Sequence, residues 1–579
     1  MTIIGLHWID FTILMVYFAV IIYVGVIQGA KQTKTLGDFY VAGGKWGPLL
    51  FFIFVFASAV AGNEAVVVAG GAYKGGLSGV WYWWSFLFAT PFYFLFSTHY
   101  RRARVYNLAE FLEMRYSKGV TVLYAIVAGL LCMLFIGGFL LAIAKILAGI
   151  TTLSTTECVI VISVLVAAYV ASGGMMSAFL TDILQGLMCL FILSFVLLPF
   201  LWIEVGGFAA LRALPKEIWS FTDPEVMSIW TVLALNLSAL VGGIAGPWIY
   251  NWIAVSKDEK TATQCGWGHL WKRVITLLFA LYGILFVLYK PGLTDPESAW
   301  GPIMKEILPI GVVGLLVASF FAAAMSSADT WAIITTGMHV DFIYRKILRT
   351  GRTAAHYLKS ARIWAVVTIL LAALSTTHVP DIKSYVKLSM GLLGFLGIPI
   401  YFGVYWRRAN RLGVWLSLIL GIAAFTTIMY VMVGEGKTFA NWDEAFPWGV
   451  FVSIPLSTAG MIIGCFVGRG EDLIQIKRFH VILNTAIGEE ERLVRAGIRL
   501  PAMIDADLVQ AGPEELDREV VEDLYEQDSH HKVFGPTSTI ELRREPNFPW
   551  YFRGFVQITL ACIALVVGTW LITRILFVW

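Results

Sequence analysis

Long uninterrupted apolar runs constrain the fold of this 579-residue chain more than any other feature. A membrane-spanning helix needs about 20 consecutive, mostly apolar residues, and about fourteen windows of the sequence meet that requirement. The pattern predicts an all-α polytopic membrane protein. The windows cover residues 7–28, 46–72, 78–98, 119–150, 156–174, 177–203, 227–255, 266–289, 309–343, 359–377, 384–405, 412–434, 446–468 and 550–576.

Composition excludes most other classes of protein. Hydrophobic residues make up 58% of the chain and charged residues only 14%, with a mean hydropathy of +0.75. A soluble domain carries about 25% charged residues, so a water-soluble enzyme is excluded. The net charge of +3 is too small to favour nucleic acid as a partner. The six cysteines lie in apolar stretches without metal-site or disulfide spacing, and we interpret them as small apolar side chains.

Lysine and arginine predict the orientation of the spans. Residues 99–118 hold five of them and residues 344–362 hold six, whereas residues 151–155 hold none. Because basic gaps face the cytoplasm, both termini of a fourteen-span chain are predicted outside the cell. The first window lacks a basic leading region and carries Asp10, so we interpret it as a span and not as a signal peptide. The predicted location is the inner (plasma) membrane.

The gaps divide the chain into five parts. We expect a leading helix and loop at 1–45, a transport core at 46–409, two additional helices at 410–468 and a final helix at 550–579. Between the last two lies a charged segment, 469–549, which this orientation places in the cytoplasm. It is either a regulatory module with a cytoplasmic protein partner or a structured linker.

Ionisable residues inside a spanning helix cost about 2.5–3.5 kcal/mol, so each is a functional hypothesis. Asn63 and Glu64 follow Gly62 in the second window, where a broken helix would expose carbonyls to a cavity. Glu64 could instead be paired to a neighbouring helix for packing. Asp182 lies near the cytoplasmic end of the sixth window, where a solvated interfacial carboxylate is the alternative.

The seventh window contains three glycines and a proline between Gly242 and Trp248, a composition that breaks a helix or lets helices pack closely. It lies five windows after the first break. Two such breaks predict a five-plus-five inverted repeat, the second to sixth windows against the seventh to eleventh. This is a design of secondary transporters that bind substrate and ion near the membrane midplane.

The ninth window carries a cluster of oxygen ligands. Ser326, Asp329 and Thr330 share one helical face, and Ser327 lies on the adjacent stripe. Hydroxyls and carboxylates are hard ligands, suited to a small cation. Hydroxyl bonding back to the helix is the alternative for the serines and the threonine, but it does not account for Asp329.

Several segments resemble, in the same order, motifs of the sodium:solute symporter family, which includes transporters of sugars, proline, pantothenate and sialic acid. The resemblance covers roughly residues 5–468. It implies a LeuT-type fold with one helix before the repeat and three after it, and Na⁺ as the cotransported ion. The segments are Asp38–Gly44, Asn107–Tyr116, Gly173–Gly186, Ala323–Ser327 and Tyr405–Asn410.

The resemblance also implies where sodium binds. The first site takes carbonyls of Ala57, Val60 and Ala323 and the hydroxyls of Ser326 and Ser327. These oxygens can replace water around one monovalent ion.

Some members of the family have a second sodium site, which here falls on Asp182, Ser326, Asp329 and Thr330. Asp329 is a departure, because the members that can be aligned carry a hydroxyl there. A second carboxylate could strengthen sodium binding or hold a proton. Two sodium ions per solute is therefore a hypothesis.

Expected substrate contacts are Asn63, Glu64, Trp83, Phe86 and Trp248. Glu64 falls on a polar position that contacts substrate in sugar-transporting relatives. Aromatic faces can stack on a sugar or hold a cation, although an interfacial aromatic belt is an equal alternative for the tryptophans.

The acidic Glu64 disfavours a simple anionic substrate unless a basic residue compensates it. Lys145 and Lys387 are the candidates for that role, although both side chains could instead reach the membrane interface.

Together these patterns predict a sodium-coupled symporter that imports a small polar organic solute by alternating access, without enzymatic chemistry. The partners are then the solute, sodium and the lipid bilayer. Two alternatives stay open: a solute sensor that signals through 469–549, and a proton-coupled symporter with Asp329 or Glu64 as the carrier. The sequence leaves the substrate open among sugars, amino acids, carboxylates and vitamins.

Overall fold

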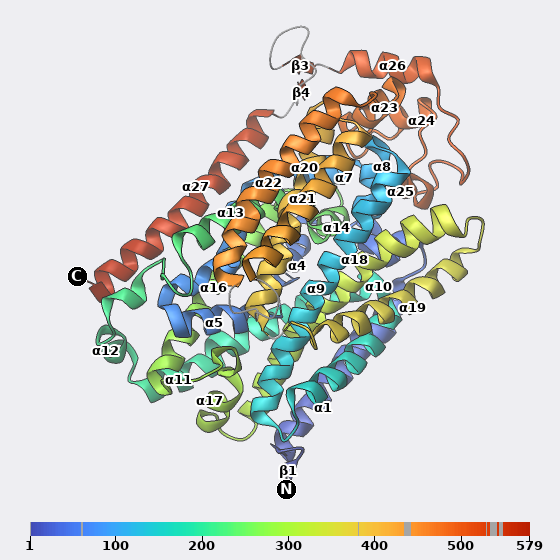
Figure 1. Cartoon of the computed structure of the whole chain (residues 1–579). Coiled ribbons are helices and arrows are strands. Elements are labelled where there is room, and N and C mark those ends of the chain that lie inside the picture. Colours follow the sequence, from blue (N-terminus) through green and yellow to red (C-terminus); the bar gives the residue numbers. More distant parts are fainter. Residues whose placement is uncertain are drawn as a thin grey trace.

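The computed structural model describes residues 2–58, 62–379, 381–433, 442–528, 530–532, 541–543 and 548–578, and most of them are helical. The strands form two small hairpins, β1 (Thr2–Ile3) with β2 (Leu6–His7) and β3 (His530–Lys532) with β4 (Glu541–Arg543). Figure 1 shows both chain termini at one end of the helical bundle, here called the terminal end. The helices of the 469–549 segment lie at the other end, here called the insert end.

Ten helices of the described residues are long and apolar enough to cross a membrane, and the bent pair α13–α14 adds an eleventh. Two shorter apolar helices, Pro48–Ser58 and Thr155–Val170, fall on two further predicted windows. The long helices are α1 (Trp8–Ile22), α9 (Lys118–Ile150), α10 (Thr155–Phe191), α13 (Ile229–Gly242), α16 (Gln264–Tyr289), α18 (Val312–Thr336), α19 (Ala354–Ser375), α20 (Ile382–Tyr405), α21 (Arg411–Val433), α22 (Trp442–Val467) and α27 (Phe548–Thr573).

Shorter helices connect or interrupt the spans. In the first half of the chain they are α2 (Ala30–Gln32), α3 (Leu36–Val41), α4 (Pro48–Ser58), α5 (Glu64–Gly75), α6 (Trp81–Trp84), α7 (Thr90–Arg102), α8 (Leu108–Arg115), α11 (Leu198–Val205), α12 (Gly207–Arg212), α14 (Pro247–Val255) and α15 (Glu259–Ala262). Later in the chain they are α17 (Trp300–Ile307), α23 (Leu473–Asn484), α24 (Glu491–Arg495), α25 (Pro501–Asp505) and α26 (Arg518–Gln527). The 3₁₀ segments used below are η7 (Gly243–Ala245) and η8 (Pro296–Ser298).

Both predicted helix breaks are present, and close packing accounts for their glycines. The first separates α4 from α5, and a Cβ on Gly62 would stand 2.6 Å from the Cα of Ala324 on α18. The second separates α13 from α14, which meet at 47° across η7. There a Cβ on Gly242 would stand 2.0 Å from the Leu393 carbonyl oxygen on α20, and Pro247 begins α14. Each break is therefore held against another helix of the core.

A third discontinuity lies inside α10. Gly174 has φ +64° and ψ −165°, which divides this 37-residue element at the boundary between the predicted fifth and sixth windows. A side chain at Gly174 would meet the ring of Phe39 in α3, with a Cβ 2.5 Å from Phe39 Cδ2. A glycine is required here for both its positive φ and this contact.

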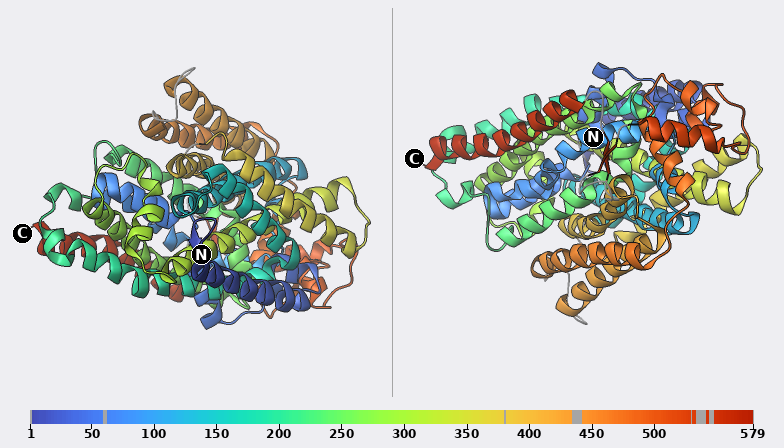
Figure 2. Two further views of the ribbon diagram at one scale, coloured as in Figure 1. Left: turned by 90° about the horizontal axis from the view of Figure 1, so that it is seen from below. Right: turned by 90° about the horizontal axis from the view of Figure 1, so that it is seen from above.

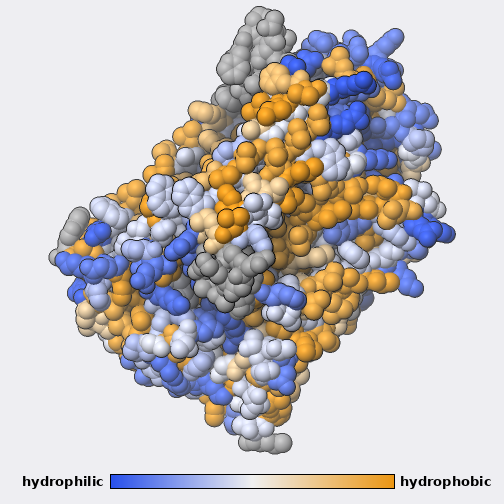
Figure 3. Space-filling model, in the orientation of Figure 1, coloured by the Kyte–Doolittle hydropathy of each residue, from blue (hydrophilic) through white to orange (hydrophobic). Residues whose placement is uncertain are grey.

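The helices that follow the core flank it on two sides. α21 and α22 pack together as a pair, with α22 also against α13 and α20, whereas α27 packs against α7 and α16. Both views of Figure 2 show the α21–α22 pair and α27 on opposite flanks of the bundle. On the face drawn in Figure 3, apolar side chains form a broad band across the bundle, and hydrophilic ones gather at the insert end.

The insert packs tightly against loops of the core. The Arg104 guanidinium donates to the carbonyls of Thr485 and Ala486 at 3.0 and 2.6 Å and to the Glu490 carboxylate at 2.9 Å. Burial would raise the pKa of Glu490, but the Gly488 N–H and Arg104 outweigh it and hold that pKa below its usual value. The insert is thus anchored to the turn that follows α7.

Candidate functional site

The first helix break lies against the middle of α18. Ser326 Oγ and Ser327 Oγ donate hydrogen bonds to the Ala323 carbonyl at 3.1 and 2.9 Å. The Gly62 N–H, beyond the break, donates to Ser327 Oγ at 3.1 Å. The residues predicted for the first sodium site on α18 therefore meet the broken helix, as that prediction requires. Hydroxyl and carbonyl oxygens are suitable ligands for a small cation.

On the α4 side of this site, the described residues include one of the two predicted ligands. Ala57 is fully buried in the last turn of α4 and packs against α10, where a Cβ on Gly186 would stand 2.4 Å from the Ala57 Cβ. Val60 lies outside the described residues.

Two carboxylates, one from α10 and one from α18, meet at the end of α4. Asp182 Oδ2 accepts hydrogen bonds from Ser58 Oγ at 2.7 Å and from Thr330 Oγ1 at 3.3 Å. Asp329 Oδ1 accepts one from the Thr330 N–H at 2.5 Å. Three of the four residues predicted for the second sodium site thus come together. Ser326 is bonded to the Ala323 carbonyl instead.

Both carboxylates are short of partners. Asp182 is fully buried and Asp329 is 2% exposed. Within the described residues, Asp182 Oδ1 and Asp329 Oδ2 have no hydrogen-bond partner, and neither carboxylate has a cationic side chain in ion-pair distance. A buried charge is costly unless it is paired. The pair therefore fits a bound cation or a proton.

A small aromatic cavity lies directly beside these carboxylates. Its volume is about 30 Å³, and the indoles of Trp248 and Trp331 stack on its wall with ring centroids 4.3 Å apart. Ser58 also lines it, so one residue contacts both the cavity and Asp182. The other lining residues are Trp83, Phe86, Phe135, Trp252, His269 and Arg273.

Three of the five predicted substrate contacts, Trp83, Phe86 and Trp248, line this cavity, and the other two do not. Glu64 forms a fully buried ion pair with Lys272 of α16 and accepts a hydrogen bond from Thr276 Oγ1 at 2.5 Å. In the structure, Glu64 is therefore paired to a neighbouring helix, which is one of the two interpretations of this residue given above.

Asn63 is buried beside α9, where a Cβ on Gly138 would stand 3.2 Å from the Asn63 Nδ2. Neither side-chain polar atom of Asn63 has a partner among the described residues.

Lys272 is the basic residue that compensates Glu64, and the sequence interpretation missed it. Neither proposed candidate does so: Lys145 pairs with Glu297 at 2.7 Å and with Asp295 at 3.0 Å, and Lys387 pairs with Asp443. The signal was available, because Lys272 and the adjacent Arg273 are charged residues inside an apolar window.

Phe135 and Trp331 were missed as well, and for a different reason. Both are apolar residues within apolar helices, so nothing in the sequence distinguishes them from ordinary packing residues.

At the insert end, a cluster of charged residues lies between α8 and the segment that follows α18. The Asp341 carboxylate on η9 (Gly337–Leu348), the π-helical segment that continues α18, accepts from Arg345 at 2.6 Å and from Asn107 Nδ2 at 3.3 Å. Lys346 pairs with Glu110 on α8 at 2.7 Å. Burial would raise the pKa of Glu110, but Lys346 and Arg345 outweigh it and keep that pKa below its usual value. This cluster joins η9, which continues α18, to α8.

A second charged cluster surrounds Glu297. Besides pairing with Lys145, the Glu297 carboxylate in η8 accepts from the backbone N–H groups of Ile382 and Lys383 at 3.0 Å each. The residue also packs on α5, because a Cβ on Gly70 would stand 3.2 Å from Glu297 Cγ. This second cluster therefore joins η8 to α5, α9 and α20.

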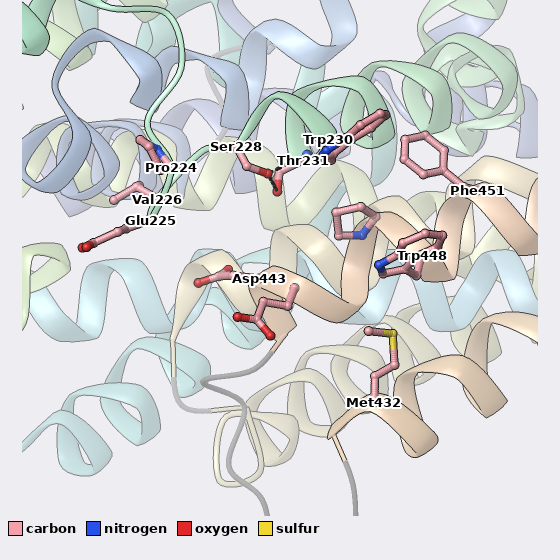
Figure 4. Close-up of a pocket in the computed structure, with 12 residues that line it drawn as sticks. Pro224, Glu225, Val226, Ser228, Trp230, Thr231, Met432, Asp443, Trp448 and Phe451 are labelled. Carbon is pink, nitrogen blue, oxygen red and sulfur yellow. Dashed lines mark hydrogen bonds between the residues drawn. The ribbon is translucent and has the colours of Figure 1, made fainter.

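A wider cavity of about 850 Å³ lies at the terminal end, away from the ion ligands. Figure 4 shows Trp230 and Thr231 at the start of α13 on one side and Trp448 and Phe451 of α22 on the other. It contains none of the predicted site residues.

Two broken helices packed against partner helices, an oxygen cluster beside the first break and a small aromatic cavity next to that cluster define a class of protein. They are the features of a secondary transporter built on an inverted repeat.

Comparisons with known proteins identify the family. A sequence model of the sodium:solute symporter family matches residues 39–421. The osmoregulated proline transporter OpuE of Bacillus subtilis is 25% identical over 487 residues, which cover 78% of this chain and 93% of that protein. Sodium/glucose cotransporter 1 of Oryctolagus cuniculus is 22% identical over 475 residues, covering 71% and 70%. The solved structure of a Na⁺-coupled sialic acid symporter superposes with a TM-score of 0.66 at 19% identity, over 80% of this chain and 99% of that chain.

The chain belongs to the sodium:solute symporter family. It is a multi-pass protein of the plasma membrane with the LeuT-type fold, and it imports a small solute coupled to sodium. The predicted fold class, coupling ion and general function are confirmed.

Proposed function

We propose that two oxygen-rich sites beside the first helix break bind two sodium ions per transported solute. The first comprises Ala57, Val60, Ala323, Ser326 and Ser327. The second adds the carboxylates of Asp182 and Asp329 and the hydroxyl of Thr330. The observation that carries this proposal is the pair of buried carboxylates, each with an oxygen that lacks a partner among the described residues.

The solute then occupies the aromatic cavity. Sodium at the two sites holds Ser58 and α18 together, and Ser58 lines the cavity. Opening of the Lys145–Glu297 cluster admits solute and ions, and opening of the Asp341–Arg345 cluster releases them. Each inward positive charge gains about 2.3 kcal/mol per 100 mV of membrane potential. The cycle needs no covalent step, so the protein is not an enzyme.

In the proposed orientation both termini face outward and the insert is cytoplasmic. The basic gaps support this arrangement, and so does the placement of the insert at the end opposite to both termini. The surrounding lipid then contacts the apolar band of the surface.

The insert acts in this proposal as part of the inner gate. Its support is the anchoring of Glu490 and of the carbonyls of Thr485 and Ala486 by Arg104. The exposed acidic side of α26 is the surface available to a cytoplasmic partner. A solute sensor would bind solute without transporting it. Counterflow of labelled solute in liposomes distinguishes such a sensor from a transporter.

A proton that moves together with sodium is the second candidate, favoured by the buried Asp329 carboxylate, whose Oδ2 lacks a partner among the described residues. It predicts sodium-dependent uptake that also responds to a pH gradient.

The proposal is tested by the thermal unfolding of the purified chain in sodium and in potassium at equal ionic strength. A ligand at a hundredfold excess over its Kd stabilises the native state by about 2.7 kcal/mol. We expect sodium to raise the unfolding midpoint of the wild type and of the exposed control Glu444→Gln. Asp182→Asn should lose the part of that increase that the second site contributes. Equal midpoints in the two salts for the wild type would refute the sodium sites.

A further inference from the structure

Arg273 is a buried guanidinium without a counter-ion. It is 1% exposed, lies on α16 and lines the aromatic cavity. Its Nη1 donates to the Trp83 carbonyl at 2.7 Å, and its Nε has no hydrogen-bond partner within the described part of the chain. No carboxylate of the described residues lies within ion-pair distance of it. A buried charge of this kind needs compensation.

Besides the Phe86 ring, whose centroid lies 5.9 Å from its guanidinium carbon, Arg273 contacts a neutral histidine. Arg273 Nη2 lies 3.0 Å from His269 Nε2, and an arginine can only donate. The His269 Nε2 is therefore the acceptor, and its Nδ1 carries the proton that it donates to Thr90 Oγ1 at 3.1 Å. The Thr90 hydroxyl donates onward to the Phe86 carbonyl at 3.0 Å. Every group in this series of hydrogen bonds is neutral except the Arg273 guanidinium.

The adjacent charges are already balanced. Lys272 is paired with Glu64, so it contributes no net charge to the cavity wall. In the proposed function, sodium compensates the carboxylates of Asp182 and Asp329. Arg273 is then the remaining uncompensated charge among the lining residues.

A second lining residue also has an unmet donor. Trp252 of α14 is 4% exposed, lines the cavity, and its indole Nε1 has no partner within the described ranges. The described lining of the cavity thus includes two buried residues with N–H donors that lack acceptors. A carboxylate accepts from several donors at once and carries the opposite charge, so it satisfies both requirements.

We infer that Arg273 and Trp252 bind the carboxylate of the transported solute, and that the aromatic rings surround an apolar or planar remainder. The substrate class is then a small organic monoanion, not a neutral sugar. This inference rests on the proposed function, because sodium must compensate Asp182 and Asp329. The cavity of about 30 Å³ has room for little more than one water molecule, so it must widen when a gate opens.

The test measures the thermal midpoint of the purified full-length chain with matched pairs of solutes. The pairs are propionate with propionamide and benzoate with benzamide, with glucose as a neutral sugar, all in sodium sulfate. We expect the carboxylates to raise the midpoint and their amides and glucose to leave it unchanged. Arg273→Gln should weaken carboxylate binding at least tenfold, Arg273→Lys less so, and the exposed control Arg553→Gln not at all.

The sodium response separates this inference from the proposed function. Arg273→Gln should keep the sodium-dependent increase in midpoint, which also shows that it folds. A wild-type midpoint that does not increase with sodium would refute the sodium sites. The carboxylate assignment is overturned if no carboxylate stabilises the wild type, or if amides or glucose stabilise it equally. It is also overturned if Arg273→Gln keeps the carboxylate response, or if sodium chloride alone reproduces the shift.

Discussion

At the scale of single residues, the charged groups inside the spans divide into those that are compensated and those that await a ligand. Glu64 and Lys272 compensate each other completely within the protein. Asp182, Asp329 and Arg273 retain unmet oxygens or N–H groups. The first pair is therefore a structural element between α5 and α16, and the other three are the groups that we propose bind sodium and solute.

Removing one member of the buried Glu64–Lys272 pair should destabilise the folded protein far more than removing both. Glu64→Gln leaves Lys272 buried without a carboxylate, which costs about 3–5 kcal/mol. The double variant Glu64→Gln, Lys272→Met should recover most of that loss. Thermal unfolding in detergent measures both, with Glu444→Gln as the control. A single variant as stable as the wild type would show that the pair carries no stabilising role.

Gly62 should be needed for sodium affinity as well as for packing. Gly62→Ala places a Cβ against Ala324, so the break must move away from α18 and from Ser327. We expect sodium affinity to fall at least tenfold. Gly119→Ala is the matched control, since a Cβ there meets nothing within 4 Å. Titration of the thermal midpoint with sodium measures this affinity. An unchanged sodium affinity in Gly62→Ala would show that Gly62 is not needed for the site.

At the scale of elements, the insert is attached to the segment that leads into the first broken helix. Asp505 of α25 accepts hydrogen bonds from the Gly37 N–H of α3 at 3.1 Å and from the Tyr106 hydroxyl at 2.5 Å. Burial and the nearby Asp505 carboxylate raise the pKa of Tyr106, so its hydroxyl stays protonated and donates. α3 leads into the first broken helix, which links the insert to that break.

Asp505→Ala should loosen this attachment without unfolding the core. Losing both hydrogen bonds at an exposed carboxylate weakens docking by about 1 kcal/mol, or roughly fivefold in opening. Hydrogen exchange of α3 and α25 should rise accordingly, while that of α18 stays unchanged. Glu489→Ala, an exposed carboxylate of the same insert, is the control. Unchanged exchange in α3 would exclude a mechanical link.

At the scale of the whole molecule, the two ends of the bundle should face opposite compartments. All six cysteines are buried, so an introduced surface cysteine can be labelled selectively. Glu217 lies in the connection between α12 and α13, and Glu519 lies on α26 of the insert; both are exposed. An impermeant thiol reagent should label Glu217→Cys in intact cells and Glu519→Cys only after lysis. The reverse pattern would invert the orientation.

The sequence predicted the spans, both helix breaks and the face shared by Asp329 and Thr330, because these depend on local composition and helical period. It did not reveal the partner of Glu64, since only the packing of α16 against α5 brings Lys272 there. The aromatic cavity was only partly predicted for the same reason, with Phe135 and Trp331 missing. Long-range pairing depends on tertiary contacts that no local pattern contains.

The stoichiometry of bound ²²Na⁺ tests the central claim most directly. We predict two sodium ions per wild-type chain, one in Asp182→Asn, and loss of the first-site ion in the double variant Ser326→Ala, Ser327→Ala. An unchanged count in Asp182→Asn would contradict the second site. Full sodium dependence in the serine double variant would contradict the first.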